Sequence, residues 1–151
     1  AGAKPLEVVV EHKGERRFMI GGAHVDSGFV TLLAQDGVEG LQAKASDGTW
    51  IDVPPVEGSM AVNFGGLLER WTGGRVKATE HRVLGQCVTG PGRERCSIPF
   101  FYEPRVDAVI RPMPGSRDFA PFTYGDHLWS AMTKFIEFAA LKDVRAPRGV
   151  T

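Results

Sequence analysis

Short apolar and β-branched runs, separated by glycine and proline, most strongly limit how this chain can fold. The 151 residues include 19 glycines and 10 prolines, and these residues end most of the runs early. Alternating runs bounded by such turn residues predict strands rather than helices. We expect strands at residues 6–10, 17–20, 29–34, 40–45, 49–53, 59–64, 79–84, 95–102 and 106–110. Many short strands with regular turn signals favour a mainly β fold, either an antiparallel sandwich or a jelly roll.

The pattern changes after Pro121. Residues 126–142 contain neither glycine nor proline. Their apolar residues recur at helical spacing, at Leu128, Met132, Phe135, Ile136 and Ala139. This spacing predicts one amphipathic helix on the outside of the barrel, with Thr123 or Asp126 as its N-cap. We expect a single domain in which residues 1–122 form the core and residues 123–151 add the helix and a tail.

Two further local features are expected within the core. Residues 67–71 are predicted to form a single helical turn, and residues 85–92, with three glycines and a proline, a loop. Gly21-Gly22 is expected to bend the backbone ahead of residue 24.

Composition narrows the function classes. Lys plus Arg and Asp plus Glu both number 18, so the formal net charge is zero. This balance argues against a nucleic-acid partner or an anionic membrane surface. No segment approaches the roughly 18 apolar residues of a membrane span, and the N-terminus predicts no signal peptide. We therefore expect a cytoplasmic protein.

The two cysteines, Cys87 and Cys96, match no metal-binding or redox spacing. They permit a single disulfide, although two free thiols in a reducing cytosol are the simpler interpretation. Cys96 is expected to fill space in the core or to face a neighbouring layer.

His24 and Asp26 are the first candidates for chemistry. Residues two apart on a strand point to the same side, so this imidazole and this carboxylate could bind one metal ion. A second histidine, His81, lies in another predicted strand. Two histidines and one carboxylate on one side of a metal suit non-haem Fe(II) and oxygen chemistry. The alternative is an aspartate that merely hydrogen-bonds a neighbouring histidine on a polar sheet face.

Arg95 and Ser97 form the second candidate site. They would share one face of a strand, with no acidic residue two positions away. If that face points inward, the buried guanidinium needs an anion. Arginine binds carboxylates through two parallel hydrogen bonds, and the serine hydroxyl can add a third. The alternative is a surface arginine on an edge strand.

Several runs, in order and at matching intervals, resemble one known family. They lie at residues 22–28, 31–36, 40–42, 47–55, 62–65, 70–72, 81–83 and 95–101. Over about residues 20–114 the sequence resembles the iron(II)/2-oxoglutarate-dependent dioxygenases of the isopenicillin N synthase-like group. A match of this length is more specific than any one motif.

The resemblance implies a double-stranded β-helix, which is a jelly roll, and an enzyme that oxidises a small organic substrate. It implies that His24, Asp26 and His81 are the facial triad that binds Fe(II). It also implies that Arg95 and Ser97 bind the distal carboxylate of the cosubstrate 2-oxoglutarate. The reaction would use O2 and release succinate and CO2.

The chain also departs from the family pattern. Gly66 stands where the family usually has aspartate, and Glu80 where it often has proline. Residues 8–12 offer no tyrosine to help bind 2-oxoglutarate, and the family's helical N-terminal region is missing from these residues. We therefore expect a further N-terminal segment or a partner chain to cover the pocket.

Two alternatives to the 2-oxoglutarate enzyme remain open. One is an iron-dependent oxidase of the same family that does not use 2-oxoglutarate. The other is an inactive binding or scaffold barrel, since a fold does not guarantee an activity. The remaining notable residues are expected to be structural: His12 and His127 on the surface, Trp50 and Trp71 in packing.

Overall fold

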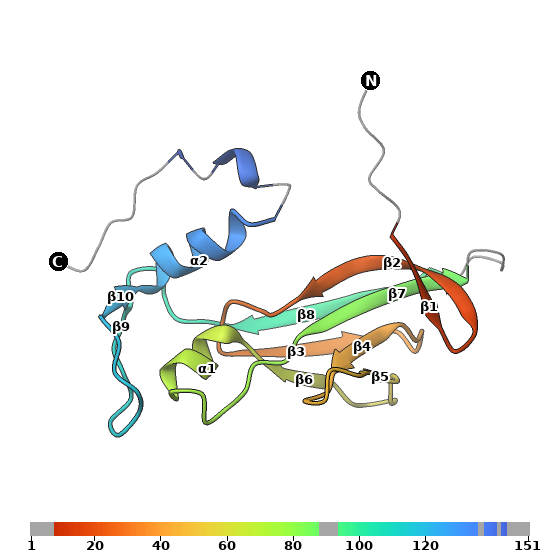
Figure 1. The fold of residues 1–151 in the computed structure, drawn as a ribbon, viewed down its shortest axis with the longest axis horizontal. Coiled ribbons are helices and arrows are strands. Elements are labelled where there is room, and N and C mark those ends of the chain that lie inside the picture. Colours follow the sequence, from red (N-terminus) through yellow and green to blue (C-terminus); the bar gives the residue numbers. More distant parts are fainter. Residues whose placement is uncertain (1–7, 88–93, 136–137, 142, 145–151) are drawn as a thin grey trace. The chain divides into compact units, whose positions relative to one another are not determined.

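The computed structural model describes residues 8–87, 94–135, 138–141 and 143–144 (Figure 1). The strands are β1 Val9–His12, β2 Glu15–His24, β3 Val30–Gln35, β4 Leu41–Lys44, β5 Trp50–Asp52, β6 Ala61–Phe64, β7 His81–Cys87, β8 Ser97–Tyr102, β9 Val109–Ile110 and β10 Phe122–Thr123. The helices are α1 Gly66–Trp71, α2 Tyr124–Met132 and the 3-10 helix η1 Ala139–Leu141. The mainly β class expected from the sequence is confirmed.

The chain divides into two compact units, and the first contains a five-stranded antiparallel sheet. This unit comprises residues 1–25, 33–61 and 79–99. The strand order in its sheet is β1-β2-β7-β4-β5 (Figure 1). Strand β2 continues without a break through Gly21-Gly22, where a bend was predicted. Register shifts against β7 accommodate this path, so the pairing continues to the last residue of β2, His24.

One polar side chain is buried within this sheet, and the polar side chains around it satisfy its hydrogen bonds. Gln42 is fully buried beside Leu41. Its amide oxygen accepts from Arg82 Nε at 2.8 Å, and its amide nitrogen donates to Asp52 Oδ1 at 2.8 Å. His12 belongs to the same group, 3.1 Å from both Gln42 Nε2 and Asp52 Oδ1. The prediction of His12 as a surface residue is therefore wrong, because its side chain is only 15% exposed.

The second unit is built around an apolar cluster. It comprises residues 26–32, 62–78 and 100–151. Leu67, Ile110 and Tyr124 are buried at its centre. Trp71 packs edge-on against Phe29, with ring centroids 5.6 Å apart, as expected of a packing residue. Helix α1 forms where one helical turn was predicted, because Leu67 enters this cluster.

Helix α2 is shorter than the sequence predicts. The expected span of residues 126–142 is wrong, since α2 ends at Met132 and, of the described residues after it, only Ala139–Leu141 returns to a helical form. The hydroxyl of Thr123 caps the helix by accepting from Asp126 N. Beyond the helix, the backbone hydrogen bonds tighten to a three-residue spacing, from Lys134 N to Ala131 O and from Phe135 N to Met132 O, so the α-helical pattern ends there. Residues 136, 137 and 142 of the prediction lie outside the described residues.

Some strand boundaries also differ from prediction. Strand β7 extends to Cys87, into the expected loop at 85–92, of which residues 88–92 lie outside the described part of the chain. The last predicted strand, 106–110, forms only at Val109–Ile110, which pairs with the unpredicted strand β10. A third sheet has the order β6-β3-β8. Within the described ranges, no helix has the length and apolar character needed to cross a membrane.

Candidate metal centre

His24 and His81 face each other across two paired strands. His24 ends β2 and His81 begins β7, and the antiparallel register places them directly opposite. Their ring centroids are 4.4 Å apart. Strand pairing therefore brings together two imidazoles that lie 57 residues apart in the sequence.

Backbone carbonyls set the orientation of both rings. His24 Nδ1 lies 2.8 Å from Gly22 O, and His81 Nδ1 lies 3.1 Å from Thr79 O. Because a carbonyl oxygen only accepts, each Nδ1 carries the proton in this arrangement. Each neutral ring then presents the Nε2 lone pair, the form in which histidine binds a metal.

Asp26 lies just beyond β2, and two side-chain donors hold its carboxylate. Asn63 Nδ2 donates to Asp26 Oδ2 at 2.8 Å, and the hydroxyl of buried Thr31 donates to the same oxygen. Such donors orient a ligating carboxylate. Neither supporting residue was predicted from the sequence. The expectation that His24 and Asp26 share a strand face is wrong in detail, since the strand ends at His24.

Backbone contacts fix the loop that carries Asp26. Gly66 N donates to Asp26 O at 2.7 Å. Gly65 is buried against this loop, and a Cβ on it would lie 2.2 Å from Gly28 O and 2.9 Å from Asp26 O. Only glycine permits this close approach.

His127 also supports this loop. Its Nε2 donates to Ser27 O at 3.0 Å. Burial is the main cause that lowers the pKa of His127. The prediction that His127 lies on the surface is therefore wrong. No spacing in the sequence indicates a link between residues 27 and 127.

The three predicted ligands form one cluster. His24, Asp26 and His81 can each offer a ligand atom, and these atoms all lie within 4.8 Å of one another. Asp26 follows His24 by two residues, so the covalent chain itself keeps the carboxylate near the imidazoles. Two neutral imidazoles and an oriented carboxylate fit a divalent iron site with open positions.

Arg95 has polar partners but, in the part of the chain that the structure describes, no acid paired with it. It lies just before β8, and it donates to Ser97 Oγ at 3.1 Å and to Gln35 Oε1 at 3.0 Å. Both partners are neutral. Its Nε is buried and has no hydrogen-bond partner among the described residues. A guanidinium with neutral partners and a spare donor is suited to an anionic ligand.

Asp36 is the acidic residue whose charge interacts with Arg95. The backbone N–H of Cys96 is the main cause that lowers the pKa of Asp36, and the Arg95 charge is the smallest. No ion pair joins these two side chains, so Asp36 leaves the hydrogen-bonding positions of Arg95 to Ser97 and Gln35. The role of Gln35 was not predicted from the sequence. The prediction that Cys96 fills space in the core is wrong, because Cys96 is a free and exposed thiol.

Comparison with known families defines the class of protein. Residues 9–104 match the model of the 2OG-Fe(II) oxygenase superfamily. This match covers more than half of the chain, and the chain belongs to that superfamily.

Individual relatives support the same class. The 2-oxoglutarate-Fe(II) type oxidoreductase hxnY of Emericella nidulans is 47% identical over 94 residues, which are 62% of this chain and 26% of the relative. The 1-aminocyclopropane-1-carboxylate oxidase 4 of Arabidopsis thaliana is 50% identical over 93 residues, 61% of this chain and 28% of the relative. The chain thus spans little more than a quarter of these curated relatives.

Solved structures agree with the fold class. The crystal structure of a full-length Neurospora crassa protein in complex with alpha-KG matches with a TM-score of 0.66 and 34% identity, over 76% of this chain and 38% of that one. The rice dioxygenase for auxin oxidation matches with a TM-score of 0.65 and 32% identity, over 76% and 40%. These oxygenases share the jelly-roll fold, which confirms the fold predicted from the sequence.

Proposed function

We propose that this chain carries the catalytic centre of an Fe(II)- and 2-oxoglutarate-dependent oxygenase that oxidises a small organic substrate. 2-Oxoglutarate and O2 would be consumed, and succinate and CO2 released. The observation that carries this proposal is the cluster of His24, Asp26 and His81, whose ligand atoms lie within 4.8 Å of one another. The family match and a relative solved with alpha-KG support it.

Each residue has a distinct role in the proposed site. His24 and His81 present Nε2 atoms, and Asp26 supplies the negative charge that a divalent cation requires. Bound Fe(II) would supply the redox centre for oxidation by O2. Arg95 and Ser97 would bind the distal carboxylate of 2-oxoglutarate, with Gln35 holding the guanidinium in place.

An oxidation without 2-oxoglutarate is the second candidate. It is favoured by the similarity to the 1-aminocyclopropane-1-carboxylate oxidase 4 of Arabidopsis thaliana, which is 50% identical over 93 residues. In that case Arg95 and Ser97 would bind a substrate carboxylate. The third alternative is an inactive binding or scaffold barrel. It requires that His24, Asp26 and His81 together bind no metal.

Measurements of metal binding and of oxygen uptake together distinguish the oxygenase, the oxidase and the scaffold. We expect Mn(II), used as an inert stand-in for Fe(II), to bind by calorimetry and to lose that binding in His81→Ala and Asp26→Ala. Asp47→Ala, which removes an exposed carboxylate outside the cluster, is the control for charge. O2 uptake with Fe(II) that requires 2-oxoglutarate supports the oxygenase, and uptake without it supports the oxidase. Absence of metal binding in the unmodified protein would leave only the scaffold.

The domain organisation, the substrate class, the compartment and the covering of the pocket are also proposals. We propose that residues 1–122 form the oxygenase core and residues 123–151 a helix and tail packed on it. Burial of Tyr124 with Leu67 and Ile110 supports this arrangement. The substrate is proposed to be a small molecule rather than a nucleic acid, and the compartment to be the cytoplasm. The proposed covering N-terminal segment or partner chain agrees with the short span of the chain in its relatives.

A further inference from the structure

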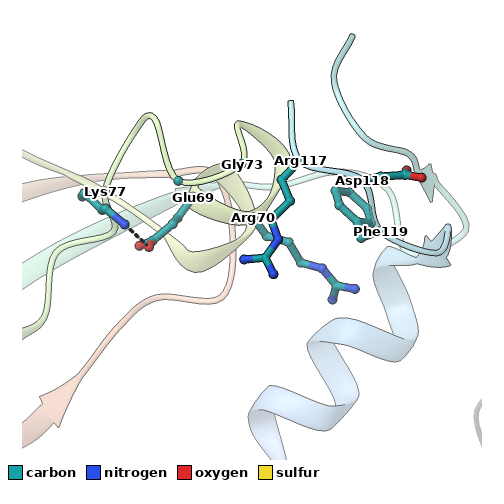
Figure 2. Close-up of a pocket in the computed structure, with 8 residues that line it drawn as sticks. Glu69, Arg70, Gly73, Lys77, Arg117, Asp118 and Phe119 are labelled. Atoms are coloured by element: carbon teal, nitrogen blue, oxygen red, sulfur yellow. Dashed lines mark hydrogen bonds and ion pairs between the residues drawn. The ribbon is translucent and has the colours of Figure 1, made fainter. Parts of the chain in front are cut away.

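A pocket of about 380 Å³ lies beside the end of α1 in the second unit (Figure 2). Arg70 and Lys77 line it from α1 and the segment that follows, and Arg117 and Phe119 from the loop after β9. Its volume lies at the lower end of the range for small-molecule sites.

Two loops are held closely together to form this pocket. Gly73, with φ of +64°, packs so tightly that a Cβ would lie 2.7 Å from Arg117 N. A side chain at position 73 would therefore push the Arg117 loop away. Gly74 N donates to Glu69 O at 2.8 Å, which closes the turn after α1. Backbone contacts thus fix the two segments that carry Arg70 and Arg117.

One cation of the pocket is already neutralised. Lys77 Nζ pairs with Glu69 Oε1 at 3.0 Å, and Ala78 N donates to Glu69 Oε2 at 2.8 Å. That backbone hydrogen bond is the main cause that lowers the pKa of Glu69, so its carboxylate stays charged at neutral pH. The positive charge of Lys77 is therefore balanced by the negative charge of Glu69.

Two guanidinium groups remain without acidic partners. Among the described residues, neither the Arg70 nor the Arg117 side chain forms a hydrogen bond or an ion pair. Arg70 stacks on Phe119 and Phe122, at 4.9 and 4.0 Å from the ring centroids, which holds its plane but leaves its N–H edge unused. Figure 2 shows the Arg70 and Arg117 side chains extending to the same side, whereas Asp118 points away from them.

We propose that this pocket binds a small dianion whose acidic oxygens accept hydrogen bonds from Arg70 and Arg117. A planar guanidinium binds the paired oxygens of a carboxylate or a phosphate through two parallel hydrogen bonds. A dicarboxylate and a phosphate share this chemistry, and both are small enough for the pocket. The pocket lies wholly within the second unit and uses no residue of the proposed metal or 2-oxoglutarate site.

The test measures binding of succinate and of inorganic phosphate by calorimetry at low ionic strength. An Arg95→Gln background removes the other proposed carboxylate site. We expect saturable binding of at least one probe, and the tighter-binding probe identifies the acid. Arg117→Gln should weaken that binding about tenfold or more, as expected for loss of charge-assisted hydrogen bonds.

Two further variants separate binding from folding. Arg70→Lys keeps the charge but loses the planar fork, and should also weaken binding, with circular dichroism and Tm unchanged. Arg105→Gln removes an exposed arginine that is already paired with Asp107, and should leave binding unchanged. Absence of saturable binding for both probes, or equal binding by Arg117→Gln and the unmodified protein, would overturn the proposal. Either result leaves the metal cluster and the proposed oxygenase function unaffected.

Discussion

The side-chain amide of Asn63 donates a hydrogen bond to Asp26 Oδ2 at 2.8 Å. Strand β6 thereby supports a proposed metal ligand that lies 37 residues earlier in the chain. Removal of such a supporting donor typically lowers metal affinity by about 10–100-fold. We therefore expect Asn63→Ala to bind Mn(II) more weakly by a factor in that range, as measured by electron paramagnetic resonance titration. Val62→Ala, which shortens the neighbouring exposed side chain, is the control. Unchanged affinity in Asn63→Ala would mean that Asn63 does not support the site.

Gly65 is expected to tolerate no side chain. A Cβ there would lie 2.2 Å from Gly28 O, and relief of that clash must displace the loop that carries Asp26. We expect Gly65→Ala to lower the free energy of unfolding by about 1–3 kcal/mol, as overpacking usually does, and to weaken Mn(II) binding. Urea denaturation and the Mn(II) titration measure the two effects. Gly22→Ala should change neither, because a Cβ at Gly22 meets nothing within 4 Å.

Arg95 is expected to bind through its planar fork rather than through charge alone. Lysine at this position keeps the charge but cannot reach Ser97 and Gln35 while also pairing with a carboxylate. We expect Arg95→Lys to raise the Kd for 2-oxoglutarate about tenfold or more, with Mn(II) affinity unchanged. Calorimetry measures both, and Arg105→Lys is the matched control at an exposed position. Wild-type affinity for 2-oxoglutarate in Arg95→Lys would remove Arg95 from the proposed site.

Asp52 is expected to make stability depend on acid pH. Hydrogen bonds from Lys13 first, and then from Gln42, lower the pKa of Asp52 to about 2. The ordinary pKa of this carboxyl is 3.8. A carboxyl whose pKa is lowered by folding stabilises the fold at pH values above its ordinary pKa. That contribution declines as the pH falls from about 4 towards 2.

The comparison of Asp52→Asn with the unmodified protein tests this dependence. The difference between their urea midpoints should be largest above pH 5 and should shrink steadily as the pH falls towards and through about 2. Glu57→Gln, at an exposed residue without a hydrogen bond or ion pair to the described residues, should show no such trend. A difference for Asp52→Asn that stays constant from pH 6 to pH 2 would contradict the prediction.

The pattern of apolar runs predicted most strands but not their ends. Strand β4 and helix α1 lie within a residue of their expected positions. Their apolar residues Leu41 and Leu67 are buried, as the local apolar pattern predicts. The predicted helix at 126–142 continued past Met132 because its apolar spacing does so. Spacing identifies a helix face, but it does not show where the backbone hydrogen bonds change to a three-residue spacing, as they do at Lys134 and Phe135.

The sequence alone determined which residue types are present for chemistry: two histidines, one aspartate and an Arg-x-Ser pair, at intervals that resemble one family. Only the tertiary structure decided how they are held. Pairing of β2 with β7 placed His24 opposite His81. Asn63, Gln35 and His127 support the proposed site by hydrogen bonds to residues 37, 60 and 100 positions away in the sequence. The physical reason is that hydrogen bonds between remote segments depend on strand register and loop packing, and neither is encoded in the local spacing of residues.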